Sequence, residues 1–99
     1  MLNELNSKQR KTLVDIFTTP IKSDILWKNV ESLFTALGGE VSQGRGSRVR
    51  VLLNGVRAVF HQPHPQRETP KGTIKSVRDF LESAGISDGN DLLPEDEDI

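Results

Sequence analysis

The chain has 99 residues, enough for one domain, and its 34% hydrophobic and 27% charged residues are ordinary for a soluble globular protein. No apolar run approaches the roughly 18 residues that a membrane-spanning helix needs. The polar first eleven residues do not resemble a secretory signal, so we expect a cytoplasmic protein. There are no cysteines, which excludes disulfides, thiolate metal sites and cysteine nucleophiles.

The net charge of −1 conceals a strong asymmetry along the chain. Residues 41–78 hold eight Lys/Arg and one Asp/Glu, whereas residues 79–99 hold eight Asp/Glu and no Lys/Arg. A basic segment of this density attracts polyanions, and a terminal acidic run is typical of a solvated tail. We therefore predict an N-terminal extension over 1–22, a domain over 23–87 and a disordered acidic tail over 88–99.

Two helices are predicted in the first forty residues. A short apolar pattern follows Asn6 and Ser7, either of which can cap a helix, and we expect this helix to lie outside the core-forming unit. A longer apolar stripe over 26–37 predicts a second helix, capped by Ser23 or Asp24 and ended by two glycines. We expect the aromatic side chains of this second region to be core residues.

From Glu40 the apolar period changes to two, which predicts strands over 40–43, over 47–53 and after Asn54-Gly55. Asn-Gly is the strongest short signal for a hairpin, because a type I′ turn needs positive φ at both central residues. A two-residue loop fixes the register of the two strands. One face then pairs Leu53 with Val56, Val51 with Ala58 and Val49 with Phe60, and the other pairs Leu52 with Arg57, Arg50 with Val59 and Arg48 with His61.

An irregular loop with three prolines follows, and then a helical pattern over 71–84 that Gly85 ends. The order helix, three strands, helix predicts an α+β domain in which two helices cover the apolar face of an antiparallel sheet. The opposite, largely basic face is left for solvent or a partner.

Three short motifs occur in a particular order. Gly46-Ser47 enters a strand, an irregular stretch carries His64, and residues 68–74 (ETPKGTI) open a helix that ends in Ala84-Gly85-Ile86. Over about residues 30–86 the chain resembles the HicA family of bacterial toxins. The resemblance implies a fold like that of the double-stranded-RNA-binding domain, cleavage of messenger RNA as an mRNA interferase, and inhibition by a HicB-like antitoxin.

One residue departs from the family pattern. The resemblance implies a cleaving histidine directly after the Gly-Ser pair, where this chain has Arg48, and it matches His64 to a second family histidine. Two alternatives therefore stay open beside the active toxin. One is a catalytically silent RNA-binding module of the same fold, and the other is a protein-interaction domain that docks an acidic partner.

The candidate chemistry rests on histidine and arginine. Histidine ordinarily titrates near neutral pH, so His64 and His61 are the candidate catalytic residues, and arginine can bond phosphate through two donors. Each set of residues also has a plainer interpretation. The arginines can form a solvated sheet face without a ligand, and His64 can serve only to hydrogen-bond the loop backbone. No metal or other cofactor is expected. The candidate RNA-binding residues are Arg45, Ser47, Arg48, Arg50, Arg57, Arg67, Lys71 and Lys75.

Overall fold

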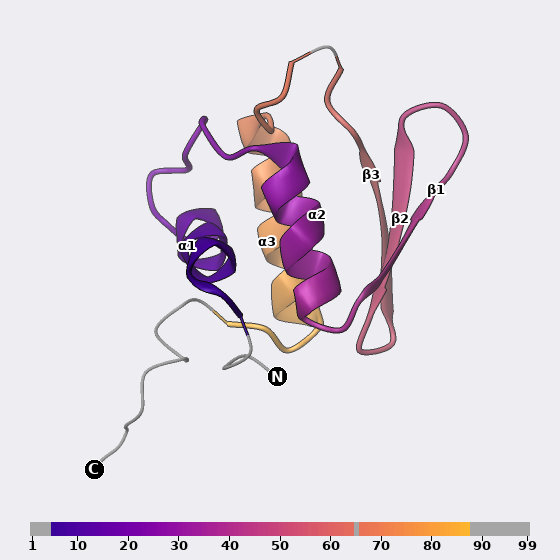
Figure 1. The fold of residues 1–99 in the computed structure, drawn as a ribbon, viewed down its shortest axis with the longest axis horizontal. Helices are drawn as coiled ribbons and strands as arrows, with labels where there is room; N and C mark the ends of the chain where they lie inside the picture. The colour runs from indigo at the N-terminus through magenta and orange to yellow at the C-terminus, as the bar shows by residue number, and fades with distance from the viewer. Residues whose placement is uncertain (1–4, 65, 88–99) are drawn as a thin grey trace.

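The computed structural model describes residues 5–64 and 66–87, and the predicted disorder of the acidic tail lies outside these residues. The chain forms three helices and a three-stranded antiparallel sheet, the α+β fold predicted from the sequence (Figure 1). The elements in chain order are α1 (Ser7–Ile16), α2 (Trp27–Ala36), β1 (Glu40–Gln43), β2 (Arg48–Leu53), β3 (Val56–His61) and α3 (Lys71–Ser83).

The sheet has the order β1-β2-β3, with every neighbouring pair antiparallel. Asn54 and Gly55 both have positive φ, 51° and 82°, as the type I′ turn requires. All six predicted residue pairs between β2 and β3 are confirmed. Because the side chains of a strand alternate between its two faces, this register buries Val49, Val51 and Leu53 and leaves the arginines of β2 exposed.

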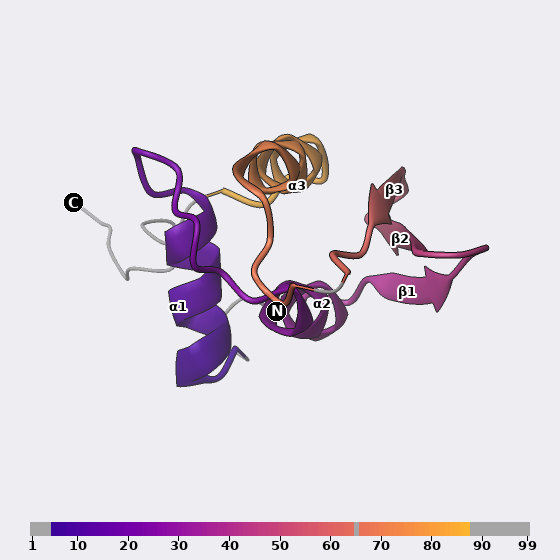
Figure 2. The ribbon, with the colours of Figure 1, turned by 90° about the horizontal axis from the view of Figure 1, so that it is seen from above.

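The molecule has three layers (Figure 2). α2 and α3 lie beside one face of the sheet, and α1 lies on the far side of these two helices. Leu13 and Ile16 of α1 are fully buried in the same core cluster as the sheet residues. The prediction that the first helix lies outside the core-forming unit is therefore wrong. α1 packs against both α2 and α3, and the apolar side chains of the three helices belong to one core cluster.

Polar contacts satisfy backbone groups at both ends of α1. Asn6 accepts a hydrogen bond from the Gln9 amide and Gln9 returns one to the Asn6 amide, so the predicted cap at Asn6 is confirmed as a capping box. At the other end the Arg78 guanidinium donates to the carbonyl oxygens of Ile16 and Thr18, both at 3.0 Å. α3 thereby satisfies carbonyls that the end of α1 leaves without helical partners.

Helix α2 begins differently from the prediction. Its N-cap is Leu26, without a side-chain hydrogen bond, so the predicted cap at Ser23 or Asp24 is wrong. The residues before the helix are extended and pair with a distant segment: Leu26 forms an isolated antiparallel bridge with Glu68, and the Trp27 amide donates to the Arg67 carbonyl at 3.0 Å. The carbonyl of Arg67, distant in sequence, thus accepts a hydrogen bond from the first amide of α2, where the sequence predicted a local side-chain cap.

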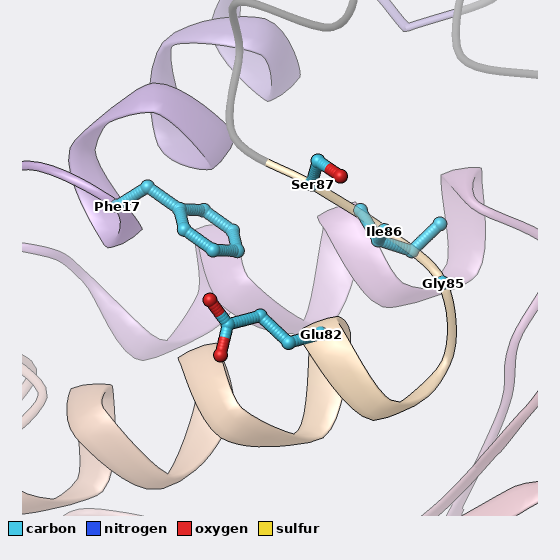
Figure 3. Close-up of a pocket in the computed structure, with 5 residues that line it drawn as sticks. All are labelled: Phe17, Glu82, Gly85, Ile86 and Ser87. Carbon is cyan, nitrogen blue, oxygen red and sulfur yellow. The ribbon is translucent and has the colours of Figure 1, made fainter.

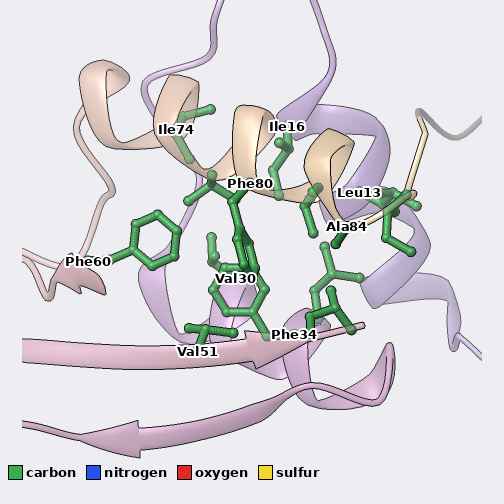
Figure 4. Close-up of a cluster of buried hydrophobic side chains, with 14 of the residues drawn as sticks. Leu13, Ile16, Val30, Phe34, Val51, Phe60, Ile74, Phe80 and Ala84 are labelled. Carbon is green, nitrogen blue, oxygen red and sulfur yellow. The ribbon is translucent and has the colours of Figure 1, made fainter. Parts of the chain in front are cut away.

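Phe34 lies at the centre of the core, as Figure 4 shows. Its ring is fully buried and packs against Trp27, Phe60 and Phe80, with ring centroids 6.5, 5.7 and 5.6 Å away. These partners come from α2, β3 and α3. One side chain therefore joins both helices to the sheet, and the burial of Trp27 and Phe34 confirms that both are core residues.

We predict that Phe34→Ala lowers the free energy of unfolding by about 3–5 kcal/mol, because it leaves a cavity among three elements. Urea denaturation followed by circular dichroism measures the effect. The matched control is Val14→Ala at an exposed position of α1, which should stay within about 0.5 kcal/mol of the parent. A decrease below about 1 kcal/mol for Phe34→Ala would contradict the central place of this ring.

Candidate nucleic-acid interface

The outer face of the sheet is basic. Arg48, Arg50 and Arg57 are all exposed there, and His61 is the register partner of Arg48. A shallow hollow of about 520 Å³ crosses this face, lined by residues of all three strands that include Arg50, Arg57 and one carboxylate, Glu40. Val59 stands beside them with 55% of its surface exposed. The face thus combines fixed positive charge with an apolar contact.

His64 lies at one end of this face. It lines a hollow of about 430 Å³ together with Gly46, Ser47, Gln62 and Pro63. The Gln62 amide donates to the Ser47 carbonyl at 2.7 Å, so the backbone ladder continues one residue beyond the paired ends of β2 and β3. The turn before β2 and the loop after β3 are consequently neighbours. Two of the sequence-predicted site residues, Ser47 and His64, therefore line one hollow.

The loop that carries His64 is irregular but anchored. The Thr69 amide donates to the Ile25 carbonyl at 2.7 Å, and the Trp27 amide to the Arg67 carbonyl at 3.0 Å. Both bonds attach the end of the loop to the segment that precedes α2. Thr69 itself is 1% exposed. The side chain of His64 is thus presented to solvent from a backbone that is fixed at both of its ends.

The remaining candidate residues are spread around the same end of the molecule. Figure 1 shows the turn before β2, the loop after β3 and the first turns of α2 and α3 at one end, where Arg45, Arg67 and Lys71 are carried. All three are exposed. Lys75, one turn further along α3, is also exposed and lies 3.7 Å from Asp79. An exposed ion pair of this kind holds its lysine only weakly.

A second cavity that His64 lines was not predicted from the sequence. It has a volume of about 310 Å³ and is lined by the first turn and a half of α2, including Lys28 and Glu31, and by the loop residues Gln62, Pro63, His64, Gln66 and Arg67. His64 lines both cavities. Some thirty residues separate the two segments, so no motif spacing could have indicated it.

A further hollow, shown in Figure 3, is lined by no residue of the sheet. It has a volume of about 290 Å³ and is lined by Phe17, Glu82 and residues 85–87, between the ends of α1 and α3. Its one charged side chain is a carboxylate. No group of three or more His, Cys, Asp or Glu within 5–64 and 66–87 could hold a metal ion.

The architecture defines a small α+β domain with a basic sheet face and a histidine-bearing loop at its end. A family model described as the HicA toxin of bacterial toxin-antitoxin systems matches residues 27–86, which is more than half of the chain. The protein belongs to the HicA toxin family. The match begins with α2 and ends just after α3, so α1 lies outside it. No curated protein and no solved structure matches the chain.

Across the portion that the structure describes, every helix is too short or too polar to span a bilayer.

We predict that Thr69→Val stabilises the fold by about 1 kcal/mol. The Thr69 hydroxyl is buried and has no hydrogen-bond partner among the described residues, and an unsatisfied buried hydroxyl costs free energy that a methyl group of the same shape does not. The backbone bond to Ile25 is unaffected by the change. Thermal unfolding should show a higher midpoint for the valine variant and a lower one for Thr69→Ser, which keeps the hydroxyl and removes a methyl group.

Proposed function

We propose that this protein is the toxin of a bacterial toxin-antitoxin pair, that it binds messenger RNA and that it cleaves it. The observation that carries the proposal is the hollow shared by Ser47 and His64 at the end of an arginine-bearing sheet face, within a HicA domain. Its target lies in the cytoplasm, and a HicB-like antitoxin would hold it inactive.

Binding would rest mainly on phosphate contacts. Arg48, Arg50 and Arg57 are exposed on one face, and none of them forms an ion pair with another described residue. Such side chains can displace the counterions of a polyanion, and the affinity then falls steeply as salt is added. The lysines at the start of α3 and the arginines of the adjoining loops extend this charge toward His64.

Cleavage without a metal requires a base for the ribose 2′-hydroxyl. In the proposed reaction His64 takes this proton, the 2′ oxygen attacks phosphorus, and the bond from phosphorus to the 5′ oxygen breaks. The products are a 2′,3′-cyclic phosphate and a 5′-hydroxyl end. Arg48 suits the charge that builds up on the phosphate, and its register partner His61 is the candidate donor to the leaving oxygen.

A specific observation supports a second candidate function. Position 48, where the family resemblance implies a cleaving histidine, is occupied by an arginine that cannot exchange a proton near neutral pH. If neither His64 nor His61 carries the proton in place of residue 48, the protein is an RNA-binding module that does not cleave RNA.

We predict that Arg50→Ala combined with Arg57→Ala weakens RNA binding and its salt dependence. The slope of log affinity against log salt should fall by about 0.7–0.9 for each phosphate that the variant no longer neutralises. Fluorescence anisotropy with a structured RNA at several salt concentrations measures both effects. The control is Lys8→Ala with Lys11→Ala on α1, which removes the same charge from the far side of the helices. Unchanged affinity in the arginine variant would reject this face as the RNA surface.

We predict that His64→Ala lowers the rate of RNA cleavage by about 10²- to 10⁴-fold and relieves growth arrest on induction, because a general base of this kind contributes that much. Binding affinity and the circular dichroism spectrum should stay close to those of the parent. Thr35→Ala, a change at an exposed position of α2 that lines neither cavity at His64, serves as the control.

His61→Ala distinguishes the two histidines. If His64→Ala and His61→Ala are both as toxic as the parent, histidine catalysis is wrong. A parent chain that binds RNA but neither cuts it nor arrests growth would favour the silent module.

A further inference from the structure

The second cavity beside His64 has the form of a ligand site. With a volume of about 310 Å³ it lies at the small end of the range for such sites. Leu26, Trp27 and Pro63 give it apolar walls, while Lys28, Glu31 and Arg67 add charged groups. Sites of this kind combine apolar surface with a few placed polar groups that fix the orientation of the ligand. The first turns of α2 form one wall, and the anchored loop forms the other.

The Glu31 carboxylate is held in place within this cavity. Its Oε2 accepts a hydrogen bond of 2.6 Å from the indole Nε1 of Trp27, whose side chain is in turn fixed in the core at 4% exposure. Within residues 5–64 and 66–87, Oε1 accepts no side-chain or backbone donor. One carboxylate oxygen is thus oriented by the core and the other remains available to a ligand that donates a hydrogen bond.

We infer that this cavity receives the nucleobase next to the phosphate at His64 and selects a base with an exocyclic amino group, cytosine over uracil. The inference rests on the proposed RNA binding. His64 lines both this cavity and the Ser47 hollow. An RNA strand whose phosphate contacts His64 can therefore place the adjoining base in the second cavity. Lys28 and Arg67 also line this cavity, and in this arrangement they would supply positive charge for the flanking phosphates.

The selection follows from the chemistry of an ionised carboxylate, which only accepts hydrogen bonds. Cytosine presents an amino group at N4, the usual partner of Glu and Asp in base recognition. Uracil has a carbonyl oxygen at the same place, and its lone pairs repel the carboxylate. The two pyrimidines are nearly equal in size, so the cavity separates them by this one group.

The test uses short fluorescent oligocytidine and oligouridine strands with 2′-O-methyl riboses, which lack the nucleophile and cannot be cut. The parent should bind the cytidine strand at least about fivefold more tightly, the lower end of what one good base contact provides. Trp27 is the only tryptophan in the chain and lines the cavity, so its fluorescence should respond to the cytidine strand more than to the uridine strand.

Glu31→Gln is the informative variant. Its amide oxygen can still accept the Trp27 indole N–H, while its amide nitrogen can donate to the uracil carbonyl, so the preference for cytidine should fall to about twofold or less. Glu82→Gln, which removes the same charge at the distant end of α3, should keep the parent ratio. This control separates base selection from a general rise in affinity caused by removal of a negative charge.

Two failures are distinguishable. Equal affinities of the parent for both strands, or an unchanged ratio in Glu31→Gln, would overturn the base-selection site while leaving RNA binding intact. If neither these strands nor a structured RNA binds, the proposed function fails and the inference fails with it.

Discussion

The register of the β2–β3 hairpin is the constraint on which the rest of the molecule depends. A two-residue turn with positive φ at Asn54 and Gly55 allows one pairing of the strands, and a slip of one residue would exchange their two faces. In the observed pairing the apolar side chains meet α2 and α3, and the arginines face solvent. The core and the basic surface are thus two sides of one pairing.

The second organising contact is the attachment of the proline-rich loop to the segment before α2. Backbone bonds from Trp27 to Arg67 and from Thr69 to Ile25 hold the loop against the helix. His64, carried by this loop, lines both the hollow at Ser47 and the cavity at Glu31. Rigid support of a loop side chain is what both proton transfer and base selection require, because each depends on a fixed position relative to the substrate.

Arg48 determines which residues of the candidate interface could transfer a proton. In the proposed function an arginine at this position would contact phosphate but could not carry a proton, so catalysis in this chain would depend on the histidines of β3 and the loop. Helix α1 contributes elsewhere: it covers the outer side of α2 and α3 and receives Arg78 at its end. The family match does not include it, yet its apolar side chains belong to the common core.

The sequence by itself determined every element whose signal is local. Apolar periodicity, the Asn54-Gly55 turn and the glycine after α3 predicted the helices, the strands and the register, and the register predicted the basic face. The same reasoning failed where distant segments meet. It assigned a local cap to α2, which a bridge to Glu68 replaces, and it excluded α1 from the core. The cavity at Glu31 could not be predicted from the sequence either, because its walls come together only through long-range backbone bonds. Periodicity shows which side chains are buried, whereas the partner that buries them is decided by packing in three dimensions.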